Sequence, residues 1–409
     1  MATYNQVTPE IIEELKKISG DRVVVGADVN PDYSRDEMPI YGTKMPDVSI
    51  DVLSTEEVSA IMKICYDNNI PVTCRGAGTG LVGACTPIAG GMRAVKYGAT
   101  RDYVRAMTVV LPTGEIVKMG ATVSKTSSGY SLLNLIIGSE GTLGIITELT
   151  LKLIPAPKQT VSLICPFEDL ATCISTVPLF KKAHMDPQAL EFFEREILIS
   201  SEEYLGKAVF PRNIGGQDVG AYLLVTFDAN TQDAIDALVE QAAELVVEAG
   251  AMDVLVADTP AKMKDAWAAR SSFLEGIEEQ TKLLDECDVV VPVSKIADFV
   301  LYIKEIDKEF DFEVKMFGHA GDGNLHVYTC SVDMEMDAFV KQVDQFMRKL
   351  YAKTTELGGQ ISGEHGIGMG KVEYLAESVG PVNMRLMEEI KKVFDPKMIL
   401  NPGKVCYTL

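Results

Sequence analysis

Histidines are scarce in this chain, and three of the four lie in two glycine-rich segments. His319 and His326 stand at the two ends of "HAGDGNLH", and His365 follows Glu364 in "SGEHGIGMG". Two imidazoles at the ends of one turn can converge on a point, and a carboxylate from a second turn can join them. These ligands suit Zn²⁺ or Mn²⁺, and three protein ligands leave one coordination position open for catalysis.

A core or capping role is the other interpretation of these histidines, and it is the usual one for a lone histidine. Three scarce histidines in similar turns favour a functional site instead. The fourth, His184 in "KKAHMD", fits a helix end and is given no role.

A glycine-rich loop, "RGAGTGLVG", is a second candidate site. Gly78, Gly80 and Gly83 spell G-x-G-x-x-G directly after the apolar segment 70–74, which is expected to be a strand. The pattern alone is typical of a fold that places a dinucleotide phosphate at a helix N-terminus. The loop runs into "ACTPIAGG", however, whose proline and glycines prevent a helix. We expect backbone N–H groups, with Arg75 at the start of the loop, to cradle a pyrophosphate without that helix; a mobile turn is the alternative.

Another stretch, "SSGYSLLNLIIGSEGTLGIIT", combines glycines with small hydroxyl residues. Such residues let the backbone approach a flat, bulky ligand closely. A tightly turned antiparallel sheet explains the same composition, so the pattern by itself leaves both interpretations open.

The composition restricts the class of protein. The net charge of -21 disfavours nucleic acid and anionic membrane surfaces, although it could steer a basic partner or only aid solubility. No apolar run reaches the ~18–20 residues of a membrane span, and the N-terminus lacks the apolar core of a secretory signal. The eight cysteines are scattered without a C-x-x-C pair, so reduced thiols and a cytoplasmic location are expected.

Helix and turn signals place a domain boundary near Pro155. Before it, one helix is expected after the N-cap Thr8, and another after the capping box of Ser54 with Glu57. Two apolar runs on either side of residues 112–114 predict a hairpin.

After Pro155 strands and helices alternate, which indicates an α+β domain with an antiparallel sheet and helices on one face. The expected strands are 160–165, 220–227, 253–257, 288–293, 313–317 and 325–330. The expected helices are 170–182, 231–249, 260–282, 294–310, 335–356 and one that begins at residue 383.

Together these segments resemble the FAD-binding oxidase family of the vanillyl-alcohol-oxidase type, in its D-lactate/glycolate dehydrogenase branch. The motifs that carry the resemblance span residues 45–405 in family order; they include "IPVTCRGAGTGLVGACTP", "SSGYSLLNLIIGSEGTLGIITELTLKL", "WAARSSF", "GHAGDGNLHV", "ISGEHGIGMGK" and "DPKMILNPGK". The resemblance implies a FAD-binding domain of two α+β subdomains (1–155), a ferredoxin-like substrate and metal cap (156–375) and C-terminal helices that pack back on the FAD domain (376–409).

One departure from the family pattern concerns the FAD domain. The family carries several dozen more residues between "TPIAGG" and "MRAVKYG", including a second pyrophosphate loop and strands of the second subdomain. Here the two flanks meet at residues 89–91. The second subdomain is therefore expected to be incomplete, with an unpaired sheet edge exposed.

The resemblance also assigns roles to individual residues. The residues expected to hold FAD are Arg75, Gly76, Gly78, Thr79 and Gly80 at the pyrophosphate, Ser128, Gly138, Glu140, Gly141 and Ile146 along the flavin or adenine, and Lys404 near the flavin. His319, His326 and Glu364 match metal ligands for zinc, manganese or iron. His365 matches the general base, Asn324 lies beside the substrate, and Arg270 matches the residue that pairs with the substrate carboxylate. Without the resemblance, a surface ion pair explains Arg270 equally well.

The implied activity is a FAD-dependent D-2-hydroxy-acid dehydrogenase, with D-lactate as the expected substrate. Electrons would pass to a soluble acceptor such as electron-transfer flavoprotein. The alternatives are a glycolate or D-2-hydroxyglutarate dehydrogenase of the same family, a metal-dependent hydrolase without flavin, and a non-catalytic subunit.

Overall fold

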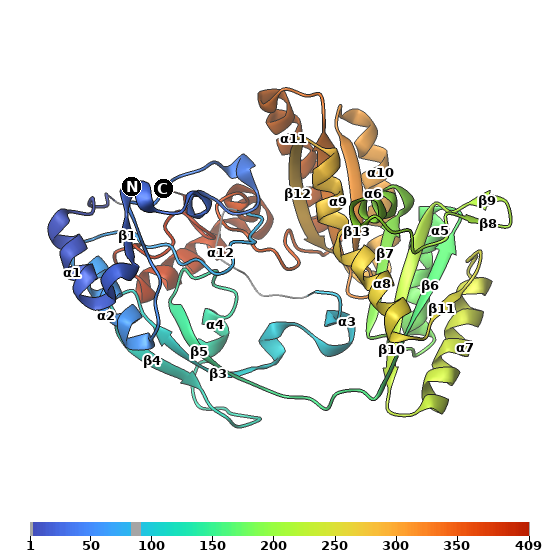
Figure 1. Cartoon of the computed structure of the whole chain (residues 1–409), viewed down its shortest axis with the longest axis horizontal. Helices are drawn as coiled ribbons and strands as arrows, with labels where there is room; N and C mark the ends of the chain where they lie inside the picture. The colour runs from blue at the N-terminus through green and yellow to red at the C-terminus, as the bar shows by residue number, and fades with distance from the viewer. Residues whose placement is uncertain (1–2, 83–90, 409) are drawn as a thin grey trace. The chain divides into compact units, whose positions relative to one another are not determined.

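The computed structural model describes residues 3–82 and 91–408, which form two compact units. The first unit combines Met1–Ala89, Ala99–Leu153 and Glu364–Leu409. The second unit combines Gly90–Gly98 with Ile154–Gly363. Segments from both ends of the chain therefore lie in one unit (Figure 1). The domain boundaries expected at residues 155 and 375 stay predictions.

The first unit contains four helices and two small sheets among its described residues. Its helices are α1 (Pro9–Ser19), α2 (Thr55–Asp67), α4 (Leu132–Ile136) and α12 (Val372–Phe394). Its strands are β1 (Val23–Val25), β2 (Val48–Ile50), β3 (Val104–Val110), β4 (Ile116–Gly120) and β5 (Ile145–Leu151), and short 3₁₀ helices occupy Gly20–Arg22, Gly26–Asp28, Pro31–Ser34, Pro39–Tyr41 and Thr100–Asp102.

The predicted caps of α1 and α2 are confirmed. The Thr8 hydroxyl accepts a hydrogen bond from the third residue of α1, and the Ser54 hydroxyl accepts one from Glu57 N at 3.1 Å. The Glu57 carboxylate accepts from Leu53 N at 2.7 Å. In the usual capping box this side chain accepts from the N–H of the N-cap residue itself. Here it accepts from the N–H of the residue before the N-cap.

The strand expected at residues 70–74 does not form among the described residues. Val72 makes only an isolated parallel bridge to Leu400, in which Asn401 N donates to Val72 O at 2.8 Å. The partner for this segment comes from far along the chain. The apolar run at residues 70–74 predicts a strand, but it gives no information about this distant partner. The pairing extends over only one residue.

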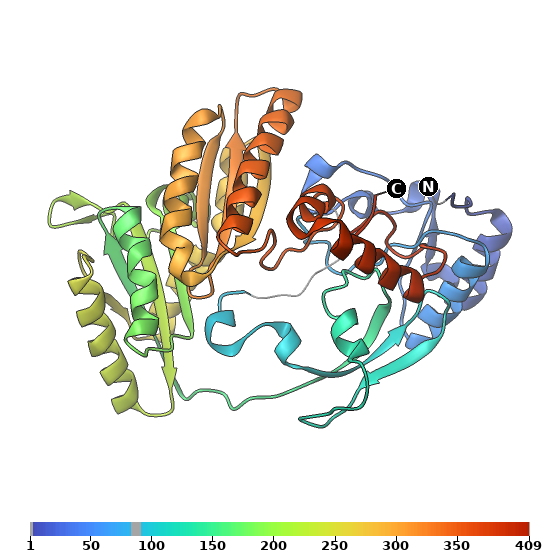
Figure 2. The ribbon, with the colours of Figure 1, turned by 180° about the vertical axis from the view of Figure 1, so that it is seen from behind.

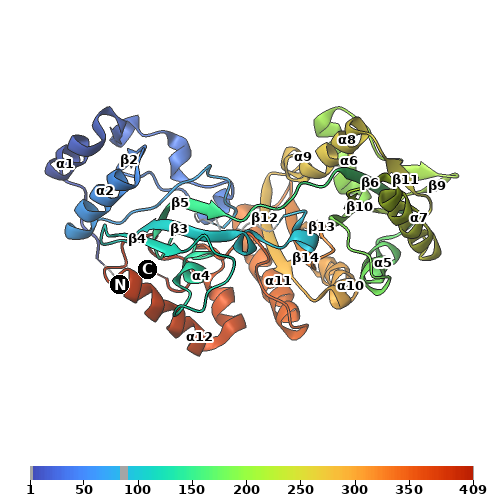
Figure 3. The same ribbon diagram turned by 90° about the horizontal axis from the view of Figure 1, so that it is seen from below.

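Strands β4, β3 and β5 form a three-stranded antiparallel sheet in this order (Figure 3). The hairpin predicted around residues 112–114 is confirmed by the pairing of β3 with β4. In the described part of the chain, β5 pairs with β3 alone, and Ile146, Leu149 and Leu151 are 42–50% exposed. The first unit thus carries an apolar edge strand of the kind expected from a short second subdomain.

The second unit is built on a seven-stranded antiparallel sheet in the order β11-β6-β10-β7-β13-β14-β12. The strands are β6 (Gln159–Phe167), β7 (Ala189–Glu194), β10 (Ala221–Ala229), β11 (Leu255–Ala257), β12 (Leu283–Val290), β13 (Glu313–His319) and β14 (Asn324–Ser331); β8 (Asn213–Ile214) and β9 (Gln217–Asp218) form a separate hairpin. The helices are α3 (Ala94–Tyr97), α5 (Leu170–Lys182), α6 (Arg195–Leu205), α7 (Gln232–Glu248), α8 (Pro260–Ser271), α9 (Phe273–Gln280), α10 (Ile296–Ile306) and α11 (Met336–Glu356), with 3₁₀ turns at Val293–Lys295 and Asp307–Glu309. Strands β6, β7, β10 and β11, with α5 and α7, make the βαββαβ arrangement of a ferredoxin-like fold, which confirms the predicted fold class.

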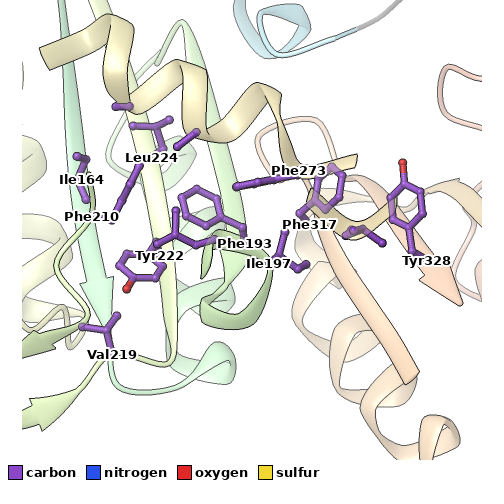
Figure 4. Packing of buried hydrophobic residues seen from close by; sticks show 14 of the residues in the cluster. Ile164, Phe193, Ile197, Phe210, Val219, Tyr222, Leu224, Phe273, Phe317 and Tyr328 are labelled. Atoms are coloured by element: carbon purple, nitrogen blue, oxygen red, sulfur yellow. The ribbon is translucent and has the colours of Figure 1, made fainter. Parts of the chain in front are cut away.

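Helices cover both faces of this sheet, so the expectation of one covered face is wrong. Phe193, Tyr222 and Leu224 point toward α6, α8 and α9, as Figure 4 shows for part of the cluster. The alternate residues Leu223 and Val225 are equally buried, and α5 and α7 contact β6 and β10 (Figure 2). The four consecutive apolar residues Tyr222–Val225 in β10 are the signal of a strand buried on both sides.

Two helical predictions also need correction. The helix expected over 260–282 is two helices, because the chain turns at Ser272; this turn brings Gly276 against the backbone of α6, where a Cβ would come within 2.7 Å of Ser200 and Ser201. The last helix begins at Val372 instead of residue 383, and its kink at Gly380 (φ 77°) absorbs the proline that follows. Strand β7 and helix α6 were not expected.

No helix within the described ranges combines the length and apolarity of a membrane span.

Candidate active site

The β13–β14 turn brings His319 and His326 together, as predicted. His319 is the last residue of β13, and its carbonyl accepts hydrogen bonds from Asp322 N and Gly323 N at 3.2 Å. Gly323 has φ +86°, and a Cβ there would lie 2.0 Å from Val291 O, so the turn requires glycine. The rings of His319 and His326 lie 5.1 Å apart between centroids and are nearly perpendicular.

Glu191, in the middle of β7, is a site residue that the sequence analysis missed. It is fully buried, and its Oε1 and Oε2 lie 2.9 and 2.8 Å from His319 Nδ1. Burial would raise the pKa of the Glu191 carboxyl, but its interactions with His319 and Arg270 outweigh this effect and the pKa is lowered. The side chain is therefore ionised at neutral pH. A charged residue inside the apolar run "ALEFFE" was the available signal.

Arg270, near the C-terminus of α8, shares the same carboxylate. Its Nε donates to Glu191 Oε2 at 2.8 Å, and its Nη2 lies 2.7 Å from that oxygen. The guanidinium stands 5.2 Å from the ring centroid of Phe273 and 4.8 Å from that of Phe317. Arg270 is 6% exposed, so the alternative of a surface ion pair is wrong.

Strand β12 adds two buried carboxylates beside His326. Glu286 Oε1 lies 3.4 Å and Asp288 Oδ1 3.9 Å from His326 Nδ1. Asn324 Nδ2 donates to Asp288 Oδ1 at 2.7 Å and to Val289 O at 2.9 Å, which fixes the amide at the start of β14. Asn324 therefore sits in the same cluster as the histidines.

The second glycine-rich turn begins beside β12, to which it pairs at a single residue. Gln360 exchanges two backbone hydrogen bonds with Val290, and Ser362 Oγ donates to Asp288 Oδ2 at 3.0 Å. A Cβ on Gly363 would lie 2.3 Å from the Asn324 side chain. The chain continues from Gly363 into Glu364 and His365, which belong to the first unit and stand 3.6 Å apart between Oε1 and Nε2.

The donor set of the second unit fits a divalent metal. Two buried imidazoles face each other, and carboxylates lie on the Nδ1 side of both. A carboxylate that accepts a hydrogen bond from Nδ1–H fixes the tautomer whose Nε2 lone pair can ligate a metal, which is the usual arrangement of a metal-binding histidine. His319 meets this condition at 2.8 Å.

Glu140 holds the segment that follows His365 within the first unit. Its buried carboxylate accepts from Ile367 N at 2.8 Å and from Gly368 N at 2.7 Å. Val82 O accepts from two further N–H groups of this segment. Burial raises the pKa of Glu140, while these hydrogen bonds and the nearby lysines Lys404 and Lys371 oppose the increase. The role of Glu140 beside the flavin or adenine stays a prediction.

The glycine loop contains no helix as far as Val82, and its continuation, with Gly83, lies outside the described residues. Gly78 has φ +86°, and a Cβ there would lie 2.0 Å from Arg75 Nη2. Only glycine therefore lets the guanidinium lie across the loop, where Arg75 Nη1 donates to Arg35 O at 2.8 Å. Exposed backbone at Gly76 and Thr79 beside a cation fits a pyrophosphate.

The other residues expected at FAD all lie in the first unit. Lys404 Nζ donates to Asn401 Oδ1 at 3.2 Å, and Asn401 Nδ2 donates to Gly141 O at 2.9 Å. Gly138 and Gly141 have positive φ, which suits close approach of a ligand to the backbone, whereas Ser128 and Ile146 are exposed. Their contacts with a cofactor stay predictions.

Comparison with known proteins identifies the family. A model of the C-terminal domain of FAD linked oxidases matches residues 156–405, and a FAD binding domain matches residues 46–89. The chain belongs to the FAD-linked oxidase family, and its cofactor is accordingly FAD.

Relatives match along nearly the whole chain. It is 57% identical to a D-lactate dehydrogenase of Anaerostipes hadrus, with 99% of each chain covered, and 31% identical to glycolate oxidase subunit GlcD of Bacillus subtilis, with 98% of this chain and 97% of the relative covered. A crystal structure of p-cresol methylhydroxylase has the same fold, with a TM-score of 0.73, 16% identity, and 100% and 99% of the two chains covered.

The comparison with the A. hadrus relative also bears on the short second subdomain. That alignment extends over 470 positions, which exceeds the 409 residues of this chain by 61. The relative therefore has positions without a counterpart here. The match to the FAD binding domain ends at residue 89, where the sequence predicts the missing segment.

Proposed function

We propose that this protein is a FAD-dependent dehydrogenase that oxidises D-lactate to pyruvate. The observation that carries the proposal is the buried group of Arg270, Glu191, His319 and His326, in which a guanidinium suited to a substrate carboxylate lies beside imidazoles suited to a metal. The 57% identity to a D-lactate dehydrogenase supports this choice of substrate.

Each step of the proposed reaction has a residue suited to it. Arg270 binds the substrate carboxylate, because a guanidinium presents donors that match both oxygens. His319, His326 and Glu364 would hold a zinc, manganese or iron ion, whose chemistry is to lower the pKa of the α-hydroxyl. His365 accepts the hydroxyl proton on a ring nitrogen, since a neutral imidazole is a suitable base near pH 7. Asn324 orients the substrate.

The first unit would bind the cofactor that accepts the hydride. When bound, FAD supplies the acceptor for the hydride that leaves the substrate Cα. The backbone of the glycine loop and Arg75 bind its pyrophosphate, and Lys404 provides a cation near the flavin. Loss of one hydride and one proton converts the 2-hydroxy acid to the 2-oxo acid.

D-Lactate should bleach the visible flavin absorbance of the FAD-loaded protein under anaerobic conditions, and His365→Ala should slow this bleaching by about 10²–10⁴-fold because the general base is lost. Stopped-flow absorbance measures both rates. His184→Ala is the matched control, since His184 is exposed and has no assigned role, and its rate should equal that of the wild type. A folded, FAD-loaded protein that D-lactate leaves oxidised would contradict the proposal.

Glycolate is the second candidate substrate, because a relative named as a glycolate oxidase subunit covers nearly the whole chain. The same bleaching experiment with glycolate decides between them through the ratio of the two rates. The rivals outside the family are a flavin-free hydrolase and a non-catalytic subunit, and the two FAD-related domain matches argue against both.

We further propose that a soluble flavoprotein, such as electron-transfer flavoprotein, reoxidises the reduced cofactor. The acidic net charge of -21 would favour a partner with a basic surface. Turnover with D-lactate should therefore be faster with electron-transfer flavoprotein than with a quinone analogue, and the rate should fall as salt increases. Faster turnover with the quinone would reverse this assignment.

A further inference from the structure

Glu191 connects two groups to which the proposed function gives separate tasks. Its carboxylate lies 2.8 Å from Nδ1 of His319, a proposed metal ligand, and 2.8 Å from Nε of Arg270, the proposed anchor. All three side chains are buried within the second unit. They come from three separate elements, β7, β13 and α8.

We propose that Glu191 is a positioning residue that sets both the tautomer and metal affinity of His319 and the orientation of Arg270. This inference rests on the proposed function, which supplies the metal and the substrate carboxylate. Glu191 itself would touch neither.

The effect on His319 follows from hydrogen-bond chemistry. A carboxylate only accepts hydrogen bonds, so the ring nitrogen that faces it, Nδ1, must carry the proton. The opposite nitrogen, Nε2, then keeps its lone pair for a metal. Loss of such an outer partner typically lowers metal affinity by about 10–100-fold. For His326, the carboxylate oxygen Glu286 Oε1 lies 3.4 Å from Nδ1.

The effect on Arg270 follows from its burial. The Nε edge of the guanidinium faces Glu191, while rings of Phe273 and Phe317 lie close to it. The planar group is thereby held in one orientation, which fixes the direction in which it can present donors to a substrate carboxylate. Glu191 also neutralises a charge that would otherwise be buried without a counter-ion.

A purely structural ion pair predicts a loss of stability only, so metal affinity separates the two interpretations. We would titrate zinc into the wild type, Glu191→Ala, Glu191→Gln and Glu194→Gln in competition with a chelator. Glu194 is the matched control: it lies on the same strand and forms a partly buried ion pair with Lys304 at 2.7 Å. Glu191→Ala should bind zinc about 10–100-fold more weakly. Glu191→Gln, whose amide oxygen can still accept from Nδ1–H, should lose less, and Glu194→Gln should bind as the wild type does.

The tautomer gives a second readout that needs no metal. With four histidines in the chain, selective ¹⁵N labelling gives few ring signals to assign. His319 should carry its proton on Nδ1 in the metal-free wild type and lose this preference in Glu191→Ala. Wild-type zinc affinity in a folded Glu191→Ala would overturn the inference. If the wild type binds no zinc, the metal part of the proposed function fails, and the tautomer of His319 alone decides the role of Glu191.

Discussion

Replacing Lys391 with methionine should lower the free energy of unfolding by about 3–5 kcal/mol, because it leaves a buried carboxylate without its counter-charge. Lys391 is 1% exposed and Asp395 0%, and their Nζ–Oδ2 distance is 2.5 Å. The ammonium also donates to Thr142 O at 2.6 Å and Leu400 O at 2.8 Å, so it ties α12 to the distant Thr142 and to the segment that follows the helix. Urea unfolding followed by circular dichroism measures the loss.

The next residue of the helix provides the control. Lys392 forms an i,i+4 pair with Glu388 at 2.6 Å, but both side chains are at least 39% exposed. Lys392→Met should therefore change the free energy by less than about 1 kcal/mol. Equal effects of the two substitutions would show that burial does not determine the strength of the Lys391 interactions. The double variant Lys391→Met with Asp395→Leu should regain part of the loss, since no charge is then stranded.

Replacing Arg270 with methionine should reduce kcat/KM for D-lactate by about 30- to 1,000-fold. This range corresponds to the ~2–4 kcal/mol lost when one partner of a buried, hydrogen-bonded charge pair is removed. Arg270→Lys should be intermediate, because a lysine keeps the charge without the planar fork. The rates are measured with the FAD-loaded protein and an artificial acceptor.

Two controls separate carboxylate binding from stability. Arg212 also pairs with a buried acid of the second unit, Glu202, at 2.8 Å, and Arg212→Met should leave kcat/KM nearly unchanged. Lactamide, which lacks the carboxylate, should react slowly with the wild type and lose little more with Arg270→Met. A folded Arg270→Met enzyme with wild-type kcat/KM for D-lactate would refute the assignment of the anchor.

The part of the site that could be predicted from the sequence depends on local geometry. Gly323 marks a tight turn, and the short span between His319 and His326 leaves little freedom, so their proximity follows from the turn itself. The same holds for the caps at Thr8 and Ser54.

The part of the site that the sequence did not predict, the contacts of Glu191, depends on the order of the strands in the sheet. Glu191 meets His319 and Arg270 only because β7 lies between β10 and β13 in the sheet and α8 packs on the same face. Strand β13 and helix α8 both lie far from β7 in the sequence, so no local pattern could show what the buried acid contacts. The helices on the second face of the sheet were missed although consecutive apolar residues in β10 indicated burial on both sides.

The division of the chain has a consequence for the order of folding. Almost all of the second unit comes from one continuous segment, Ile154–Gly363. The first unit instead joins residues more than 200 positions apart, as in the contacts of Glu140 with Ile367 and of Lys391 with Thr142. Contacts across such distances form slowly, because long loops must close first. During synthesis the second unit can be complete while α12 is still unmade, so the unit that begins the chain would finish folding last.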